Sequence, residues 1–529
     1  WTKTKNKRYT RTMNIWRCYS NSIYVLSSIV TISKTTSTAA KRITSSSLYL
    51  PITTNNKRRI SSTTFAFVST TTTTTTTKRE HKRTFQSNFG TSPLNMSSSK
   101  DDKESSSQTS PTLTTSSYVQ ETLDPCVILM KQIISKHSSK WTQTQIYSLA
   151  QGVVYWKPPP CAYTALASSL QNEELHTYCP DEGLPSLLSE LQTKLSNENN
   201  LQNVNVIVTS GANQAYVNCV STLLSPSDKA IVFAPYYFNH VMAIQMMRGD
   251  DACIVGPTLI GGQPDLNWLE DTLSSSSSNK IQMVTLVNPG NPTGVSLSHD
   301  YLQQIVSLTK KYNVWLIMDN TYEHFDHAQA NSIPSGDDTN VFPCFNDDHV
   351  MNIFSFSKGY AMAGFRVGYV AISNVGEEAK EAYRQMLKVQ DTIPICTSRV
   401  SQLVALGALE AGRQWVIDQV STLEKGRNAI LDALQPLQEL HTNDCNGDKN
   451  VIMGGSGAMY VMAKLPNDMD DQKLANDLVE KYGVAIIPGS FCGYPGWIRV
   501  CYSNLPPDEC IIAASRLKDG ILNLCCCHV

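Results

Sequence analysis

A lysine and an arginine that follow one β-rich run are the residues of this 529-residue chain best suited to chemistry. The run 349–354 leads into Ser355-Phe356-Ser357-Lys358, and Arg366 comes eight residues later. Open α/β sheets bind ligands at the carboxyl ends of their strands. A desolvated lysine amine can bond to an aldehyde, and a hydroxyl with a guanidinium can hold a phosphate. Alone, such a string is more often an ordinary strand end.

Two further strand ends carry groups that suit a phosphorylated pyridine aldehyde. The buried run 284–287 is followed by a turn that contains Asn291, and the run 314–318 by Asp319 and Tyr322. The Asn291 amide and the Tyr322 hydroxyl can donate to a phenolate oxygen on such a ring. Asp319 can pair with a protonated pyridine nitrogen and so make the ring an electron sink. Taken singly, Asn291 fits a plain turn and Asp319 fits a helix N-cap.

Two upstream strands complete the pattern. The run 204–209 ends at a turn of small residues before a helix predicted over 214–224, where backbone amides can close on a phosphate. The turn residues are Gly211, Ala212 and Asn213. The run 231–234 is followed by Tyr237, which can stack on a ring or belong to an aromatic core cluster. The conjunction of these strand ends predicts pyridoxal 5′-phosphate as the cofactor.

Over about residues 118–524 these motifs resemble the fold-type I aminotransferases of class I and II. The resemblance implies that Lys358 is the Schiff-base lysine and the proton shuttle. It implies that Asp319 pairs with the pyridine nitrogen, and that Asn291 and Tyr322 pair with the ring oxygen. His240 matches a position that supports the aspartate in some members. The implied phosphate ligands are Gly211, Ala212, Asn213, Ser355 and Arg366, with Tyr237 stacked on the ring.

The same resemblance assigns residues to the substrate and to a partner subunit. Arg499 matches the arginine that clamps the substrate α-carboxylate, a two-pronged contact that lysine makes poorly. Gly152 matches the glycine whose backbone meets that carboxylate. Tyr178 matches a tyrosine that reaches the cofactor phosphate of the neighbouring subunit, which implies a homodimer with shared active sites. Taken alone, Arg499 fits a surface salt bridge and Tyr178 a packing residue.

Within the family, four stretches are similar to plant methionine-dependent aromatic aminotransferases. They are residues 149–156, 234–239, 319–323 and 389–396. The similarity implies an amino donor such as methionine or an aromatic amino acid, and an acceptor 2-oxo acid such as phenylpyruvate or indole-3-pyruvate. It also implies an apolar side-chain pocket that Tyr155 and Trp156 face.

Two other functions are open to the same residues. Similar sites catalyse C–S bond cleavage, or the cyclisation that makes aminocyclopropane carboxylate. A non-catalytic protein that binds pyridoxal phosphate is the second alternative, although such proteins usually lose the lysine or the aspartate. Both residues are present here as Lys358 and Asp319.

The composition divides the chain into two unlike segments. Residues 1–95 hold 16 Lys and Arg and one acid, Glu80, whereas the rest holds 28 basic and 44 acidic residues. A basic segment rich in Ser and Thr is typical of a plastid or mitochondrial transit peptide. Alternatively, translation starts at Met96 and the protein is cytoplasmic. In both cases residues 1–117 and the tail 525–529 are expected to be disordered.

Strands alternate with helical stretches from about 204 to 371, which predicts an α/β fold with a mainly parallel sheet covered by helices on both faces. We expect a large cofactor-binding domain over 160–400. From the resemblance we expect a smaller α+β domain built from 118–159 and 401–524. Fifteen cysteines show no zinc spacing, and no apolar run is long enough to span a membrane. We therefore expect no metal site and no membrane among the partners. We also expect no nucleic acid, because no nucleic-acid-binding motif accompanies the basic N-terminal segment.

Overall fold

The computed structural model describes residues 11–19, 22–30, 113–275, 280–327, 342, 344–442, 451–466 and 469–525. The chain divides into two units, 1–106 and 107–529. In the first unit, strands β1 (Arg11–Tyr19) and β2 (Ser22–Val30) pair antiparallel. This pair differs from the disorder predicted for 1–117, and β2 holds β-branched residues that favour strands. The other residues up to 112, Met96 among them, lie outside the described part, so the transit peptide and the alternative start stay predictions.

The second unit is built on a seven-stranded sheet of order β4-β10-β9-β8-β7-β5-β6. Neighbouring strands pair parallel, except that β10 runs antiparallel to both β4 and β9. The prediction of a mainly parallel α/β sheet is confirmed. The strands are β4 (Val204–Thr209), β5 (Lys229–Phe233), β6 (Cys253–Gly256), β7 (Ile281–Val287), β8 (Trp315–Asp319), β9 (Val350–Ser355) and β10 (Gly368–Ser373).

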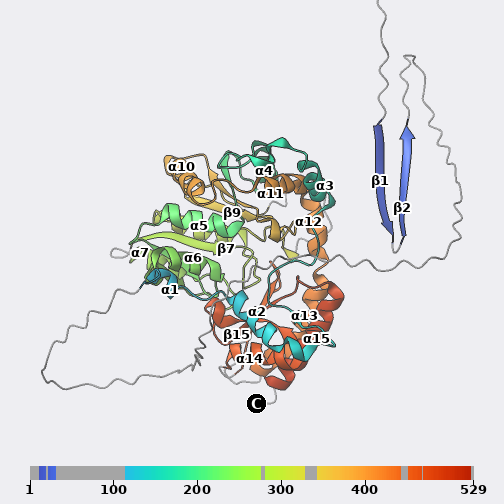
Figure 1. Cartoon of the computed structure of the whole chain (residues 1–529). Coiled ribbons are helices and arrows are strands. Elements are labelled where there is room, and N and C mark those ends of the chain that lie inside the picture. Colours follow the sequence, from blue (N-terminus) through green and yellow to red (C-terminus); the bar gives the residue numbers. More distant parts are fainter. Residues whose placement is uncertain are drawn as a thin grey trace, which may run out of the picture. The chain divides into compact units, whose positions relative to one another are not determined.

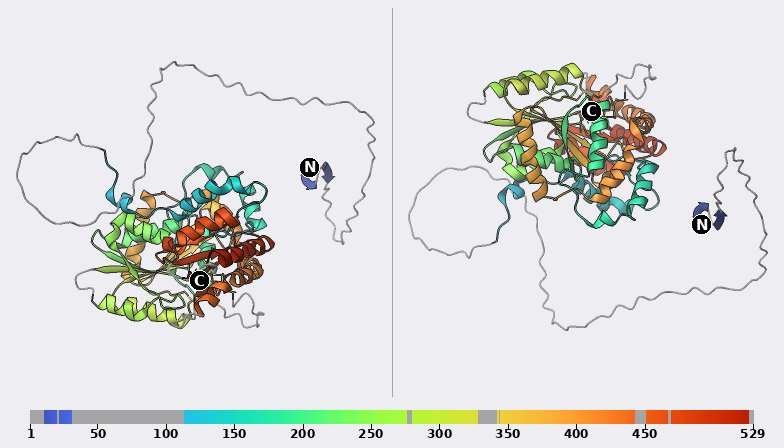
Figure 2. Two further views of the ribbon diagram at one scale, coloured as in Figure 1. Left: turned by 90° about the horizontal axis from the view of Figure 1, so that it is seen from below. Right: turned by 90° about the horizontal axis from the view of Figure 1, so that it is seen from above.

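Helices cover both faces of this sheet (Figures 1 and 2). Because side chains alternate along a strand, Ile317 of β8 packs on one face while Leu316 and Met318 pack on the other. The first face is covered by α5 (Ala212–Leu223), α6 (Phe238–Arg248) and α10 (Glu377–Thr392). The second face is covered by α7 (Leu266–Ser274) and α8 (His299–Lys311).

A second group of elements combines segments from the start and from the end of this unit's sequence (Figure 1). Strands β11 (Ile452–Gly454), β12 (Tyr460–Lys464), β15 (Trp497–Cys501) and β14 (Ile487–Pro488) form an antiparallel sheet in that order. Strand β3 (Tyr147–Ser148) pairs with β13 (Val484–Ala485). Helices α2 (Cys126–His137), α13 (Glu424–Thr442), α14 (Asp471–Asp477) and α15 (Pro507–Leu524) lie around these strands. The Cys501 N–H of β15 donates to the Leu149 carbonyl at 2.8 Å, so the segment after β3 lies close to β15. The domain boundaries at 160 and 400 stay predictions.

A buried ion pair fixes the segment that follows β8. The Glu323 carboxylate accepts hydrogen bonds from Lys194 Nζ and Asn199 Nδ2, at 2.8 Å each. Lys194 and Asn199 belong to α4 (Pro185–Asn199), which packs with α11 (Arg399–Leu409), and α11 packs in turn against α3 (Pro160–Ser169). Burial lowers the pKa of Lys194, but the charges of Glu323 and Glu198 outweigh it and raise the pKa above its usual value.

Two further α-helices of the described residues are α1 (Ser117–Glu121) and α12 (Gly412–Ser421). In the part of the chain that the structure describes, no helix combines the length and the apolar character that crossing a membrane needs.

Candidate active site

A cavity of about 920 Å³ lies at the carboxyl ends of the central strands, beside the sheet that carries Arg499. Most of the predicted site residues line it. They are Gly152, Ala212, Asn213, Tyr237, Asn291, Asp319, Tyr322, Ser355, Lys358, Arg366 and Arg499. Residues that the sequence patterns missed also line it, namely Val127, Gln151, Val153, Phe238, Val287, Thr321, Ser357, Ala363 and Tyr460.

Lys358 follows β9 and supplies the only amine among the described residues that line this cavity. Its Nζ donates a hydrogen bond to the carbonyl oxygen of Gly152. Burial lowers the pKa of Lys358 to about 8, and the nearby charges of Arg366 and Arg499 act in the same direction. At this pKa about a tenth of the amine is neutral at pH 7 and about half at pH 8, and the neutral form is the one that a nucleophile or a general base requires.

Asp319 ends β8 and is only 4% exposed. Its Oδ2 lies 3.2 Å from His240 Nε2, and its Oδ1 accepts from the Thr321 hydroxyl at 2.6 Å and the Thr321 N–H at 3.0 Å. Burial alone would raise the pKa of Asp319, but these contacts outweigh it and hold the pKa below its usual value. The structure thus places a buried, ionised carboxylate in the cavity wall, with His240 behind it stacked on Tyr216.

Arg499 lies on β15, is 2% exposed and holds Asn291. Its Nη1 donates to Asn291 Oδ1 at 3.1 Å, and its Nη2 donates to the Ala150 carbonyl at 2.8 Å. Because arginine can only donate, the Asn291 oxygen must face it, which leaves the Asn291 NH₂ group as a donor for the cavity. The buried Arg499 Nε has no partner within the described residues, so this guanidinium has capacity to bind an anion.

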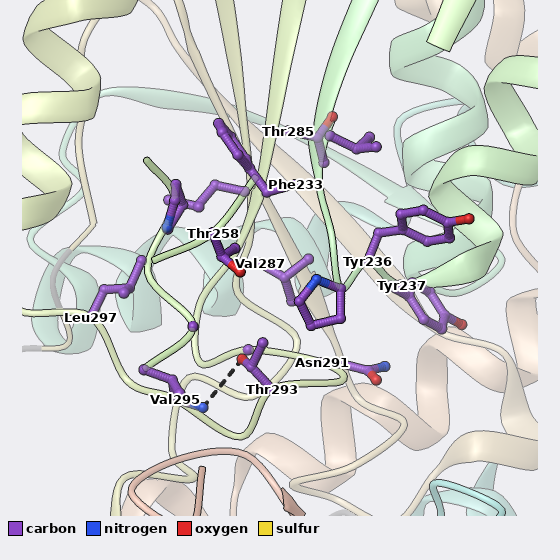
Figure 3. Close-up of a pocket in the computed structure, with 16 residues that line it drawn as sticks. Phe233, Tyr236, Tyr237, Thr258, Thr285, Val287, Asn291, Thr293, Val295 and Leu297 are labelled. Carbon is purple, nitrogen blue, oxygen red and sulfur yellow. Dashed lines mark hydrogen bonds between the residues drawn. The ribbon is translucent and has the colours of Figure 1, made fainter. Parts of the chain in front are cut away.

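The loop after β7 that carries Asn291 has hydrogen bonds of its own, of which the one between Val295 and Thr293 is drawn in Figure 3. The Val295 N–H donates to Thr293 Oγ1 at 3.3 Å, and the Leu297 N–H donates to Asn288 Oδ1 at 2.9 Å. Asn291 and Tyr237 also border a second cavity of about 500 Å³, drawn in Figure 3. The turn predicted from the sequence is therefore an ordered loop, and it places the Asn291 side chain at the cavity.

Gly211, which follows β4, and Arg366, which follows β9, lie against each other at one corner of the site. Gly211 has a φ of +83°, and a Cβ added there would lie 2.2 Å from Arg366 Nη2. Arg366 Nη2 donates to the Ser210 carbonyl at 3.2 Å. Ala212 and Asn213 begin α5, so their N–H groups have no partner inside the helix. A phosphate fits this corner, because it can bind the Arg366 cation and the N–H groups of Ala212 and Asn213 in the space that Gly211 leaves.

Replacing Gly211 by alanine is expected to weaken binding of a phosphate at this corner at least about 10-fold. The new Cβ would displace Arg366, and its positive φ would strain the backbone by about 1 kcal/mol. Titration of the purified variant with pyridoxal 5′-phosphate measures the change in Kd. Gly364→Ala is the matched control, because a Cβ there meets no atom within 4 Å. Equal affinities of the Gly211→Ala variant and the wild type would contradict the assignment.

Tyr237 and Tyr178 differ in where they lie. The Tyr237 hydroxyl accepts from Asn239 Nδ2 at 2.9 Å and donates to Asn213 Oδ1 at 3.3 Å, so the ring borders the cavity beside the phosphate corner. Tyr178 is 76% exposed and does not line the cavity of its own chain, while its carbonyl accepts from Arg399 at 3.0 Å. Its contact with a neighbouring subunit stays a prediction.

The prediction that Tyr155 and Trp156 face the substrate pocket is wrong. Neither residue lines the cavity. The Trp156 indole N–H donates to the Gly359 carbonyl at 3.2 Å, and its ring stacks on Phe325. The Tyr155 hydroxyl donates to Thr422 at 2.6 Å. Trp156 therefore supports the segment that follows Lys358, Tyr155 contacts the end of α12, and neither side chain lines the cavity.

Thr321 and Tyr460 are missed residues that hydrogen-bond to predicted ones. Thr321, two residues after Asp319, fits the local turn in which an aspartate accepts from the following backbone, so the spacing could have indicated it. The Tyr460 hydroxyl lies 2.7 Å from the Tyr322 hydroxyl, and its ring lies under Arg499. No local pattern marks Tyr460, because it begins a strand of the other sheet.

The sequence pattern described as "Aminotransferase class I and II" matches residues 144–517. The chain belongs to the class I and II aminotransferases. It is 43% identical over 387 residues to the aromatic aminotransferase ISS1 of Arabidopsis thaliana, a match that covers 72% of this chain and 91% of that protein. Over 304 residues it is 29% identical to an aspartate aminotransferase of Thermotoga maritima, covering 56% and 71% of the two chains.

Solved structures agree with the fold of this aminotransferase. The Thermotoga maritima aspartate aminotransferase superposes with a TM-score of 0.64 at 26% identity, covering 77% of this chain and all of that one. The Pyrococcus horikoshii kynurenine aminotransferase gives 0.64 at 22% identity, covering 77% and 97%, which shows the fold alone. Class I and II aminotransferases depend in general on pyridoxal 5′-phosphate. The donors described above fit that group.

Proposed function

We propose that this aminotransferase binds pyridoxal 5′-phosphate in the 920 Å³ cavity and acts on an aromatic amino acid or methionine. The amino group would pass to a 2-oxo acid such as phenylpyruvate or indole-3-pyruvate. One observation carries the proposal, namely a lysine of lowered pKa that shares a cavity with the buried carboxylate Asp319 and the buried guanidinium Arg499. Lys358 suits the aldehyde of the cofactor, Asp319 its protonated ring nitrogen, and Arg499 the α-carboxylate of the substrate.

The cofactor would be held by residues from several strand ends. Arg366, Ser355 and the amides of 211–213 would bind its phosphate, Asn291 and Tyr322 its ring oxygen, Asp319 its ring nitrogen, and Tyr237 would border its face. When bound, pyridoxal phosphate supplies an aldehyde and a ring that accepts electrons from the substrate Cα. Asp319, ionised because its pKa is lowered, keeps a proton on the ring nitrogen.

The protein's own groups then position the substrate and move one proton. Arg499 binds the α-carboxylate through the donors that its contacts with Asn291 and Ala150 leave free. Lys358 Nζ removes the proton from the substrate Cα and later returns a proton, which a pKa of about 8 allows in both directions. The Gly152 carbonyl, which accepts from Nζ, orients the amine.

Two observations favour an uncharged substrate side chain. The cationic residues of this chain that line the cavity are Lys358, Arg366 and Arg499, and each already has a role among the described residues. The cavity lining also includes the apolar side chains of Val127, Val153 and Phe238. The relative with 43% identity is named an aromatic aminotransferase, which supports the same substrate class.

We also propose a homodimer in which Tyr178 completes the site of the neighbouring subunit. The ring of Tyr178 is 76% exposed on its own chain, and its backbone is fixed by Arg399, which also pairs with Glu174 at 2.7 Å. A large exposed aromatic on a fixed backbone suits an interface. Size-exclusion chromatography with light scattering would test the assembly, and a monomer with full activity would contradict it.

An absorbance titration of the purified protein tests the function. The chain loaded with pyridoxal 5′-phosphate should show a visible band that methionine and phenylalanine bleach and phenylpyruvate restores. Bleaching by aspartate alone would overturn the substrate class, and release of ammonia with pyruvate would indicate a lyase. The Lys358 assignment would fail if no visible band formed.

Replacing Arg499 by lysine is expected to raise KM for the amino acid by about 10²-fold, because a single ammonium cannot grip a carboxylate at two points. The variant also loses the hydrogen bond to Asn291. Steady-state kinetics with phenylalanine measures the effect. Arg427→Lys is the matched control, since Arg427 does not line the cavity and donates to Gly455 at 3.5 Å. A KM unchanged in Arg499→Lys would remove the carboxylate role.

A further inference from the structure

Tyr460 contacts three groups of the candidate site, yet the proposed function gives it no role. It is the first residue of β12, and its side chain is 2% exposed. Its hydroxyl lies 2.7 Å from that of Tyr322, and the two rings meet edge to face at 81°. Its ring lies under the Arg499 guanidinium, whose Cζ is 4.6 Å from the ring centre. The residue thus joins Tyr322 after β8 to Arg499 on the other sheet.

The Tyr460 hydroxyl also occupies the space beside Gly152. A Cβ at residue 152 would lie 2.0 Å from the Tyr460 oxygen and 3.0 Å from its Cζ. Gly152 in turn accepts the hydrogen bond from Lys358 Nζ. Steric contact with Tyr460 is therefore a physical reason for a glycine at this position, and it sets how close the Lys358 acceptor comes to the phenol pair.

A single hydrogen bond joins the hydroxyls of Tyr322 and Tyr460. Each hydroxyl has one proton to donate, and among the described residues each has the other as its hydrogen-bond partner. One phenol must therefore donate to the other, and the acceptor keeps its own proton for a different partner. Both side chains line the cavity, so that proton is available to an acceptor bound there.

The charge of Arg499 decides which phenol donates. Burial raises the pKa of both groups, and for Tyr460 the guanidinium on its ring offsets part of that rise. For Tyr322, burial raises the pKa well above its usual value and the neighbouring Tyr460 adds to the rise, whereas the Arg499 guanidinium lies directly over the Tyr460 ring at 4.6 Å. Tyr460 is thus the better donor. A phenol that accepts a hydrogen bond itself becomes a stronger donor, so Tyr322 gains donor strength.

We propose that Tyr460 is a positioning residue whose hydroxyl donates to Tyr322 and so directs the Tyr322 proton toward the ring oxygen of bound cofactor. The inference rests on the proposed function, in which Tyr322 serves that oxygen. Donation to the ring oxygen stabilises its anionic form. It therefore lowers the pH at which the visible band of the bound cofactor changes.

The test is a spectroscopic pH titration of the chain loaded with pyridoxal 5′-phosphate, without substrate. Tyr460→Phe keeps the ring under Arg499 and removes only the hydroxyl. We expect its pH midpoint to rise by about half a unit, less than the rise in Tyr322→Phe. In the Tyr322→Phe background, the Tyr460→Phe change should add no shift, which a merely structural role would not predict.

Tyr369→Phe is the matched control, because its buried hydroxyl has no partner within the described residues and lies outside the cavity. Its midpoint should equal that of the wild type. An unshifted midpoint in Tyr460→Phe, or the same shift with and without Tyr322, would overturn the inference. A downward shift would reverse the donor and equally overturn it.

A second measurement does not need the cofactor. Gly152→Ala should lower the thermal unfolding midpoint of the cofactor-free protein, and adding Tyr460→Phe should recover part of the loss, because the atom 2.0 Å away is removed. No recovery would show that Tyr460 does not hold this position. A wild type without a visible band would refute the proposed function itself, whereas a normal band with unshifted variants would refute only the role of Tyr460.

Discussion

Replacement of Lys358 by alanine is expected to abolish transamination, with a loss of at least about 10⁴-fold in kcat. The reason is that Lys358 supplies the only amine among the described residues lining the cavity, and no other group there has a pKa suited to take a proton from Cα and return it. The rate of phenylpyruvate-dependent loss of the amino donor measures the effect, and circular dichroism checks the fold.

The matched control is Lys310→Ala, an exposed lysine that pairs with Asp347 and Asp348 away from the cavity. Its rate should equal that of the wild type. Activity in Lys358→Ala within 10-fold of the wild type would mean that another group moves the proton, and the whole assignment of the cavity would have to be abandoned.

The same lysine predicts a pH-dependent stability of the cofactor-free protein. The pKa of Lys358 is about 8 in the folded chain against 10.5 for an exposed lysine. Between these pH values the unfolded chain binds more protons, so stability rises with pH, and the cost of burial is full below pH 8. Lys358→Met should therefore stabilise the protein at pH 7 by on the order of 1–3 kcal/mol.

Denaturant unfolding at pH 7 and pH 10 measures this difference. Most of the gain should be gone at pH 10, because the folded lysine is then neutral and its burial no longer requires desolvation of a charge. A gain of equal size at both pH values would show that it comes from packing and not from the amine.

Replacement of Asp319 by asparagine is expected to lower kcat/KM by about 10³-fold and to weaken cofactor binding. The substitution keeps the shape and hydrogen bonds to Thr321 but removes the charge that holds a proton on the ring nitrogen. The depressed pKa of Asp319 means that the carboxylate is ionised throughout the assay range, so the loss should not depend on pH above neutrality.

Asp228→Asn serves as the control, because Asp228 is also buried but accepts from Ser225 at 2.8 Å in a turn outside the cavity. That variant should lose stability and keep its kcat/KM. His240→Asn should cost less than Asp319→Asn, since Asp319 retains both bonds from Thr321. Cofactor affinity and kcat/KM of Asp319→Asn that match the wild type would remove its proposed role.

The sequence by itself determined the α/β fold, the family and most of the cavity wall. The strand predicted over 204–209 is β4 with the same bounds, and the residues that follow the buried runs line one cavity. The physical reason is that parallel strands end at the same edge of a sheet, so each motif placed at a strand end predicts its neighbours. Lys358, Asp319 and Asn291 could be found in this way.

Only the tertiary structure decided which groups hold these residues. Arg499 against Asn291, Tyr460 against Tyr322, and Gly152 against Lys358 join residues more than 100 positions apart. The same packing turns Trp156 away from the cavity, although its position in the sequence suggested a pocket. Such contacts depend on how two sheets meet, and neither periodicity nor local spacing records that.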